Sequence, residues 1–276
     1  MKRKRNFYPK NEHWAYTLFV KHPNLYLPVL QSMREQSIKE VEGLCQIFDE
    51  FRVLPGSKVL DLSCGIGRHS INLSKRGYEV VGYDPSAFFL NKARSWTHKE
   101  GLNEDKIRFY RGDLTKVYEI LSDYGETGFN VIISMWNSHG YSSTDEDIQM
   151  FKDILGIASR NCILIIESEN RDWRIRNFEP CVIYNFNNLA IYETWKFDLE
   201  TSISKSQSKF YEKTELGKNL RLILDLKINY RLYSLHELKE IITEAGWKYM
   251  NTYGNIQRLD PATYDSKNIV TIGKKL

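Results

Sequence analysis

Along the middle of the chain, short runs of apolar residues alternate with longer stretches in which apolar and polar positions are mixed. The short runs are rich in Val, Ile and Leu and have the length of buried strands. They are predicted at 58–62, 79–83, 107–110, 130–135 and 162–167. The stretches between them are predicted as helices over 69–76, 86–99, 115–121 and 145–159. This alternation predicts a parallel sheet with helices on both of its faces.

The pattern differs on either side of this region. Residues 14–51 are predicted to be helical, with interruptions at His22-Pro23-Asn24 and at Pro28. Between Cys181 and Arg231, longer β-branched and aromatic stretches predict an inserted block of antiparallel strands. These strands are predicted at 181–186, 189–197, 202–211 and 219–230. A capped helix over 235–245 and strands at 248–253 and 268–273 then complete a seven-stranded sheet.

Four segments are therefore expected in an α/β chain whose sheet has helices on both faces. They are an N-terminal helical cap (1–54), a core (55–175), an antiparallel β insert acting as a lid (176–231) and the C-terminal part of the core (232–276). The insert is also the predicted surface for self-association.

Composition narrows the classes of protein that remain. Apolar residues make up 42% and charged residues 27% of the 276, which is ordinary for a globular protein. No apolar run reaches the roughly 18 residues needed to cross a bilayer, and the start does not resemble a signal peptide, so we expect a cytoplasmic protein. The net charge of +4 is small, and the basic run Lys2–Arg5 is interpreted as a solvated terminus rather than a phosphate-binding arm. The four cysteines are scattered, so neither a metal site nor a disulfide framework is predicted.

The segment Val59–Ser70 carries the main chemical signal, because a buried strand runs through a turn with Gly65 and Gly67 into a helix. This arrangement serves several nucleoside ligands. A carboxylate at Asp61 would repel the pyrophosphate of a nicotinamide dinucleotide but would favour the positively charged S-adenosylmethionine (SAM). Asp84, at the end of the next strand, has the spacing of an acid that binds a ribose diol. The sequence therefore favours a SAM site.

Taken together, Val59–Ser70 and Glu79–Ser86 resemble the first two cofactor motifs of the Rossmann-like (class I) SAM-dependent methyltransferases, and Cys64–His69 resembles the small-molecule branch. Ser63 departs from the glycine that is commoner in the family. Phe109–Leu114 resembles the third motif, although an Asp113 after a strand is also typical of a helix cap. The resemblance implies cofactor-binding roles for Asp61, Ser63, Cys64, Gly65, Gly67, Asp84, Pro85, Ser86, Asp113, Leu114, Met135 and Trp136.

Catalytic candidates follow the fourth predicted strand, where acceptors lie in the family. His139 is predicted as a base for an acceptor that arrives protonated, and the alternative is a loop histidine bonded to the backbone. Tyr141 is predicted to orient the acceptor or to pack against a neighbouring helix. Tyr16 and Tyr26 resemble lid tyrosines, with core packing as the alternative. Arg68 is a candidate partner for the cofactor's carboxylate, and a solvated side chain is the alternative.

Two carboxylates at the end of the fifth predicted strand, Glu167 and Glu169, are candidates for binding a cationic acceptor, and a surface position is the alternative. His236 is interpreted as a solvated helical residue. The run Trp195–Phe197, with lysines beyond it, is interpreted as one face of a sheet rather than as an RNA-binding surface.

The leading hypothesis is methyl transfer from SAM to nitrogen or oxygen of a small molecule, with S-adenosylhomocysteine as the product. The Asn-Pro-Pro-aromatic signature of enzymes that methylate nucleobase amines is missing. The alternatives are an RNA or protein methyltransferase that uses the basic tail, and a non-catalytic SAM-binding module. The sequence does not predict the identity of the acceptor.

Overall fold

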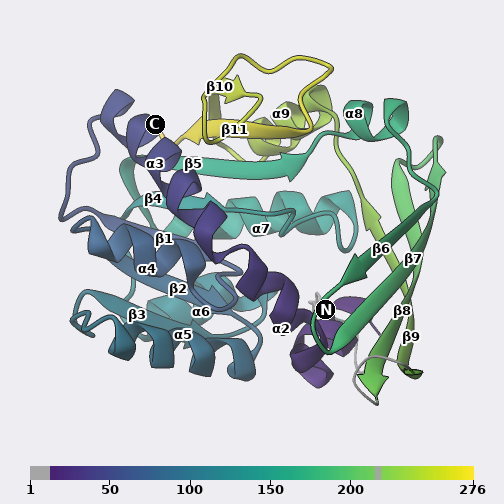
Figure 1. The fold of residues 1–276 in the computed structure, drawn as a ribbon. Helices are drawn as coiled ribbons and strands as arrows, with labels where there is room; N and C mark the ends of the chain where they lie inside the picture. Colours follow the sequence, from purple (N-terminus) through teal and green to yellow (C-terminus); the bar gives the residue numbers. More distant parts are fainter. Residues whose placement is uncertain (1–12, 215–218) are drawn as a thin grey trace, which may run out of the picture.

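A computed structural model of the protein describes residues 13–214 and 219–276 (Figure 1). The basic run Lys2–Arg5 and residues 215–218, between the last two predicted strands of the insert, lie outside the described residues. Within them, the chain forms a seven-stranded sheet with helices on both faces and a separate four-stranded antiparallel sheet. The α/β fold predicted from the sequence is confirmed, whereas the division of the chain into four segments stays a prediction.

The larger sheet has the strand order β10-β11-β5-β4-β1-β2-β3. Five neighbouring strands run parallel, and β11 is antiparallel to β5 and β10. The bounds are β1 Lys58–Leu62, β2 Glu79–Asp84, β3 Ile107–Arg111, β4 Phe129–Ser134, β5 Ala158–Glu169, β10 Lys248–Tyr253 and β11 Asn268–Lys274. Because the sheet order changes direction between β1 and β4, the carboxyl ends of these two strands border the crevice in which open α/β sheets bind ligands.

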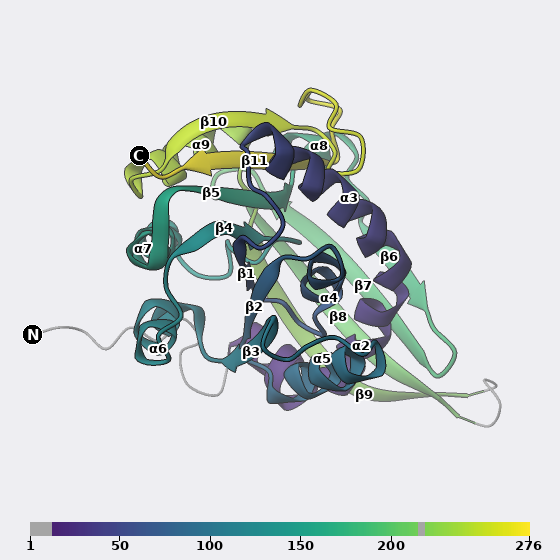
Figure 2. The same cartoon turned by 90° about the vertical axis from the view of Figure 1, so that its left-hand side faces the viewer.

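Helices cover both faces of this sheet, which explains why its strands are almost continuously apolar. The helices are α4 Arg68–Lys75, α5 Ala87–Lys99, α6 Val117–Asp123, α7 Thr144–Ile157 and α9 Leu235–Glu244, with a short 3-10 turn η2 Leu114–Lys116 before α6. Side chains of β1 alternate between the two cores: Leu60 and Leu62 pack with α6, α7 and α9, and Val59 packs with α3, α4 and α5. Figure 2 shows these two groups of helices on opposite sides of the sheet.

The N-terminal segment is helical, as predicted, but one of its predicted breaks is wrong. Its elements are α1 Trp14–Tyr16, a π-helical turn η1 Thr17–Lys21, α2 Pro23–Ser32 and α3 Arg34–Glu50. Pro28 lies inside α2 instead of interrupting it. A proline removes the hydrogen bond to the carbonyl four residues earlier, and here that carbonyl belongs to Asn24, which is exposed in the first turn and can be hydrated. The chain bends instead at His22 and Met33.

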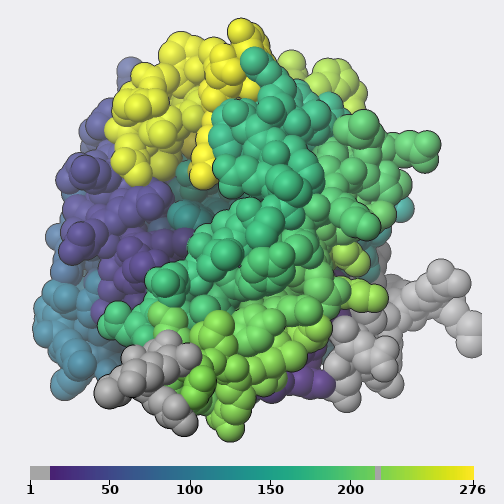
Figure 3. Space-filling view, turned by 45° about the vertical axis from the view of Figure 1, so that its right-hand side comes forward, coloured from purple at the N-terminus to yellow at the C-terminus, as the bar shows by residue number. Residues whose placement is uncertain are grey.

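The predicted β insert forms the second sheet, in the order β6-β7-β8-β9. The strands are β6 Cys181–Asn185, β7 Leu189–Asp198, β8 Ile203–Thr214 and β9 Asn219–Arg231. The sheet stands beyond the carboxyl ends of the parallel strands, with α1 and α2 (purple) beside it (Figure 1). Its side chains Ile191 and Phe210 share a core with Trp14 and Leu25. In Figure 3 the sheet forms a large part of the molecule's surface next to the N-terminal helices.

One helix was missed by the sequence analysis. The short α8, Arg171–Arg176, begins after Asn170, whose side chain accepts a hydrogen bond from the amide of Asp172. None of its side chains is buried, so it has no apolar periodicity by which to recognise it. Among the described residues, no helix is both long and apolar enough to span a membrane. Within the same ranges, no group of His, Cys, Asp and Glu side chains is arranged to hold a metal ion.

Candidate functional site

The turn between β1 and α4 holds an unusual backbone conformation. Ser63, Gly65 and Gly67 have φ angles of 55°, 56° and 76°, in the left-handed region. This region favours glycine. The φ angle of Ser63 therefore explains why glycine is commoner at this position in the family. The turn is fixed to the end of β2, because the Cys64 amide donates to the Tyr83 carbonyl (3.1 Å) and the Gly65 amide to the Asp84 carboxylate (2.9 Å).

The absence of a side chain at Gly67 matters for packing as well as for backbone conformation. A Cβ atom there would lie 3.1 Å from Ala93 Cβ and 3.2 Å from the Phe109 ring. Gly125 has a similar φ of 71° but has open space around it. We expect Gly67→Ala to lower the free energy of unfolding by about 3 kcal/mol and Gly125→Ala by about 1 kcal/mol, because only the first adds overpacking to backbone strain. Chemical denaturation measures both, and equal losses would contradict the packing argument.

Two buried carboxylates flank the turn. Asp61, at 1% exposure, accepts hydrogen bonds from the Ser70 amide (3.1 Å) and hydroxyl (2.5 Å), both at Oδ2. Asp84 accepts from the Ser86 amide (2.8 Å) with Oδ1 and from the Gly65 amide with Oδ2. Burial raises the pKa of both carboxyls, to about 6 for Asp84, and the charge of Asp61 contributes to the shift at Asp84. Each Asp84 oxygen keeps a lone pair available for a further donor.

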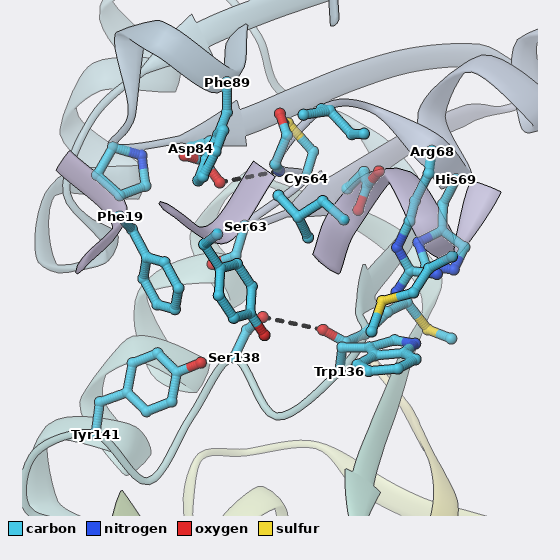
Figure 4. A pocket seen from close by; sticks show the side chains of 18 residues that line it. Phe19, Ser63, Cys64, Arg68, His69, Asp84, Phe89, Trp136, Ser138 and Tyr141 are labelled. Carbon is cyan, nitrogen blue, oxygen red and sulfur yellow. Dashed lines mark hydrogen bonds between the residues drawn. The ribbon is translucent and has the colours of Figure 1, made fainter. Parts of the chain in front are cut away.

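These residues border a cavity at the carboxyl ends of β1, β2 and β4, here called the first cavity. Its volume is about 780 Å³ including the open mouth. In Figure 4, Asp84 and Phe89 lie on one side of it, Arg68, His69 and Trp136 on the opposite side, and Phe19 and Tyr141 close a third side. The predicted site residues that line it are Asp61, Ser63, Cys64, Gly65, Asp84, Pro85, Met135, Trp136 and Tyr141.

Four predicted cofactor residues do not line this cavity. Gly67 and Ser86 lie just behind it, where Gly67 precedes α4 and the Ser86 hydroxyl caps α5. Asp113 caps η2 by accepting from the amide (2.9 Å) and hydroxyl (2.8 Å) of Thr115. It borders a separate surface hollow beside Tyr16. Leu114 is buried in the core. A direct cofactor role for these four residues stays a prediction. Asp113 has the geometry of a helix cap, which was the alternative to its predicted cofactor role.

His139 lies away from the first cavity, contrary to its predicted role as a base. Its ring is 3% exposed, stacks on Tyr233 at 5.9 Å and lies 6.2 Å from the Phe151 ring. Nδ1 is buried without a hydrogen-bond partner in the described part of the chain. Burial lowers the pKa of His139 to about 4. The neighbouring Ser138 and Tyr141 face the cavity instead, so we do not propose His139 as the base.

The buried His139 predicts a dependence of stability on pH. Its pKa is about 4 in the folded protein and 6.5 in the unfolded chain, so only the unfolded chain binds this proton between those values. We expect this residue to lower the free energy of unfolding by about 3 kcal/mol as pH falls from 6.5 to 4. Buried carboxyls such as Asp147, whose pKa is raised to about 6, act in the opposite direction.

Comparing the wild type with His139→Phe separates these contributions, because the carboxyls are common to both proteins and Phe preserves an aromatic ring between Phe151 and Tyr233. Unfolding should be measured by denaturant titration at several pH values. The difference in stability between the two proteins should change in favour of the variant as pH falls. Parallel curves would contradict the assignment.

A buried ion cluster that was missed from the sequence forms another side of the first cavity. Glu40 of α3 is fully buried and accepts from Arg68 (2.6 Å), His69 (2.8 Å), Gln36 (2.9 Å) and Trp136 (3.2 Å). Arg68 also lies 4.9 Å from the Trp136 ring centre. Burial opposes the negative charge, but the bond to His69 and the charges of His69 and Arg68 lower the Glu40 pKa to about 2. The cluster therefore fixes the cationic side of the cavity.

A second cavity adjoins the first, and its volume is about 1180 Å³ including the open mouth. It lies between the N-terminal helices, the segment after β4 and the inner face of the second sheet. Five side chains line both cavities: Phe19, Tyr26, Met33, Trp136 and Tyr141. The prediction that the N-terminal segment and the insert would together enclose a site thus has a structural counterpart in this chamber.

The remaining sequence candidates are distributed as follows. Tyr26 lines both cavities, whereas Tyr16 lies outside them, with Lys21 5.6 Å from its ring centre. Glu169 forms an ion pair with Arg174 at 2.7 Å. Glu167 is buried and borders neither cavity; burial raises its pKa to about 7. His236 is exposed beside Glu240, as interpreted from the sequence.

Comparisons with known proteins bear on the family. Residues 59–159 match the model of a methyltransferase domain family. Among curated proteins, the 23S rRNA (uracil(1939)-C(5))-methyltransferase RlmD of Alkalilimnicola ehrlichii is 40% identical over 70 residues, which are 25% of this chain and 15% of that protein. RlmD of Shewanella sediminis is 32% identical over 93 residues, covering 34% of this chain and 19% of the relative. The chain thus spans less than a fifth of the length of these relatives.

Solved structures are similar over nearly the whole chain. A SAM-dependent methyltransferase from Clostridium acetobutylicum has a TM-score of 0.73 at 15% identity, covering 92% of this chain and 98% of that one. The CcbJ methyltransferase from Streptomyces caelestis has 0.69 at 16%, covering 87% and 89%. CalS10, an amino pentose methyltransferase from Micromonospora echinaspora, has 0.62 at 12%, covering 94% and 98%. Residues 59–159 are therefore a methyltransferase domain, and the chain has the fold of these SAM-dependent methyltransferases.

Proposed function

We propose that the protein transfers a methyl group from SAM to a nitrogen or oxygen atom of a small-molecule acceptor and releases S-adenosylhomocysteine. The observation that carries this proposal is the pair of adjoining cavities with a shared wall. The first cavity is lined by most of the predicted cofactor residues, and the second has the mainly aromatic and aliphatic lining, with a few polar groups, that is typical of small-molecule sites.

The first cavity fits SAM by the chemistry of its lining. Asp84 has lone pairs for two ribose hydroxyls, and the buried Asp61 supplies a negative charge near the part of the turn expected to face the methionine group. Arg68, held by Glu40, would attract the carboxylate of the cofactor. When bound, SAM supplies a methyl group that its positively charged sulfur activates for displacement. The chain's own contribution is to hold that group next to the second cavity.

The second cavity suits an acceptor that is enclosed rather than laid across a surface. Aromatic side chains from the N-terminal helices and the second sheet surround it, so they would exclude water and restrict the orientation of a bound molecule. Tyr26 and Tyr141 stand in the wall between the cavities and are placed to contact both ligands. Burial raises the Tyr26 pKa to about 12, so its hydroxyl stays protonated at neutral pH.

RNA is the second candidate acceptor, because the RlmD proteins that match part of the chain carry an rRNA methyltransferase name. Against it, the ring of Trp195 and the charge of Lys196, the run singled out in the sequence, do not share one surface, although Tyr192 pairs in register with Lys209 on the outer face. Trp195 lines the second cavity, whereas Lys196 points to the opposite face and pairs in register with Lys205. An RNA-binding strand would instead place stacking rings and cations on one face.

Two measurements test the proposed function. Calorimetry should show binding of SAM and S-adenosylhomocysteine, and no saturable binding of a nicotinamide dinucleotide. Incubation of cell extract with methyl-labelled SAM should then place the label in the small-molecule fraction. Label in RNA that falls steeply with added salt would favour the second candidate. Binding of the cofactor without any methyl release would favour the non-catalytic alternative.

A further inference from the structure

The inner face of the second sheet combines one carboxylate with a set of aromatic rings. Alternation along β7 directs Ile191, Glu193 and Trp195 into the second cavity. Beside them on β8, the buried small residues Ser206 and Ser208 pair in register with Trp195 and Glu193. The site is thus built from strand positions, which hold side chains more rigidly than loops do.

Glu193 is the single carboxylate among the described residues that line this cavity. It is half-buried, and the Ser208 hydroxyl donates to its Oε1 at 2.8 Å. No cation of the described residues forms an ion pair with it within 4.0 Å. Burial raises the pKa of Glu193, which means that its negative charge is poorly solvated where it stands.

The two cations at this cavity are engaged elsewhere. Arg174 forms an ion pair with Glu169 (2.7 Å) and lies 5.5 Å from the Trp195 ring centre. Lys267 is exposed at the rim, 5.5 Å from the ring centre of Trp173. Arg174 and the Trp195 indole lower the pKa of Glu193 against the effect of burial, but no cation of the described residues forms an ion pair with this carboxylate.

Rings on several elements line the same cavity as the carboxylate: Trp14, Tyr26 and Tyr141 from outside the second sheet, and Trp195, Phe210 and Tyr230 from the sheet. Aromatic faces attract cations, and a carboxylate adds a charge partner for the same group. A neutral hydroxyl acceptor would gain little from either feature and would leave the charge of Glu193 without an ion pair.

We propose that the second cavity binds an amine-bearing acceptor and that Glu193 holds its cationic nitrogen between the aromatic rings. This inference rests on the proposed function, because it narrows the acceptor to one chemical class. An ammonium group has no lone pair, so it must first lose a proton, which passes to Glu193 and then to water at the cavity mouth. The nitrogen lone pair then forms the bond to the methyl carbon, while the carbon–sulfur bond breaks and its electrons stay on sulfur.

A binding experiment that needs no turnover tests the charge requirement. Choline and its neutral isostere 3,3-dimethylbutan-1-ol serve as probes, titrated by calorimetry into protein saturated with S-adenosylhomocysteine. We expect choline to bind at least tenfold more tightly than the alcohol, and Glu193→Gln to reduce this ratio below threefold. The matched control is Glu240→Gln, which removes the same charge from the exposed face of α9 and should preserve the ratio.

A second experiment uses methyl-labelled SAM and small-molecule extract, with products separated by cation exchange at neutral pH. Labelled product should be retained as a cation, and Glu193→Gln should lower its formation at least tenfold while SAM affinity stays within twofold of wild type. Equal affinity for the two probes, or label in uncharged products, would overturn the amine assignment and leave the proposed function intact. Failure of the wild type to bind SAM would overturn the proposed function itself.

Discussion

Replacing Asp84 by asparagine is expected to weaken SAM binding about a hundredfold, because two hydrogen bonds from ribose hydroxyls to a carboxylate would each contribute roughly 1.5 kcal/mol or more. The carboxylate is 6% exposed and already accepts the amides of Gly65 and Ser86. Asparagine has a similar shape but lacks the charge and presents an NH2 group to one of these donors. Calorimetry with SAM measures the effect, and a thermal melt reports whether the turn keeps its stability.

The same carboxylate predicts how cofactor binding depends on pH. Its pKa of about 6, raised by burial and by the charge of Asp61, lies above the usual value of 3.8. SAM affinity of the wild type should therefore fall as pH decreases through about 6, whereas Asp84→Asn should lack this step. Asp123→Asn, at the exposed end of α6, is the control and should bind like wild type. An Asp84→Asn protein that binds SAM within threefold of wild type would exclude the ribose role.

Removing the carboxylate of Glu40 is expected to cause the largest loss of stability, about 3–5 kcal/mol for Glu40→Ala. The substitution would leave Arg68 and His69 buried at 5% and 3% exposure without their shared partner. Such a loss corresponds to a decrease in melting temperature of roughly 6–15 °C for a chain of this size. Denaturant unfolding at pH 7 is the suitable measurement, since the stabilisation by this carboxylate is lost only as pH falls from about 4.5 towards its folded pKa of about 2.

Glu42→Ala is the matched control, because this residue lies on the same helix and also faces an arginine. Its contact with Arg76 spans 3.3 Å, and its side chain is 55% exposed. Exposed ion pairs contribute little, so a change below about 0.5 kcal/mol is expected. Similar effects at both positions would show that the ion cluster is no more important than a surface pair. The Glu40 variant should also bind SAM more weakly, since Arg68 would no longer be fixed.

The central strands and most helices were predictable because their burial produces local sequence patterns: continuous apolar runs in the strands and periodic apolar positions in the helices. Strand β1 was predicted with its observed bounds, Lys58–Leu62, and the capping box of α9 correctly marked its start at Ser234. Helix α8 has no such apolar pattern, because none of its side chains is buried. Pro28 was misinterpreted as a break, since the sequence does not reveal that Asn24, whose carbonyl it leaves without a helical hydrogen bond, is exposed in the first turn.

The parts of the site that depend on distant contacts could not be predicted in the same way. Glu40 lies in an amphipathic helix, and only the fold brings it to Arg68 and Trp136, 28 and 96 positions later. His139 was expected beside the ligand because it follows β4, but the two residues after Met135, Trp136 and Asn137, both have positive φ, which the sequence did not indicate. Alternation along β7 places Ile191, Glu193 and Trp195 on one face, but nothing in the sequence indicates what that face meets.

The wall shared by the two cavities links the affinities of their ligands. Phe19, Tyr26 and Met33 belong to one N-terminal segment, so a displacement of that segment would widen both cavities together. A ligand that holds the segment in place reduces the loss of conformational entropy that accompanies binding of the other ligand. Each ligand therefore raises the affinity for the other by the same factor. A substitution in this wall thus affects both ligands at once. A change that alters the specificity for one ligand also alters the affinity for the other.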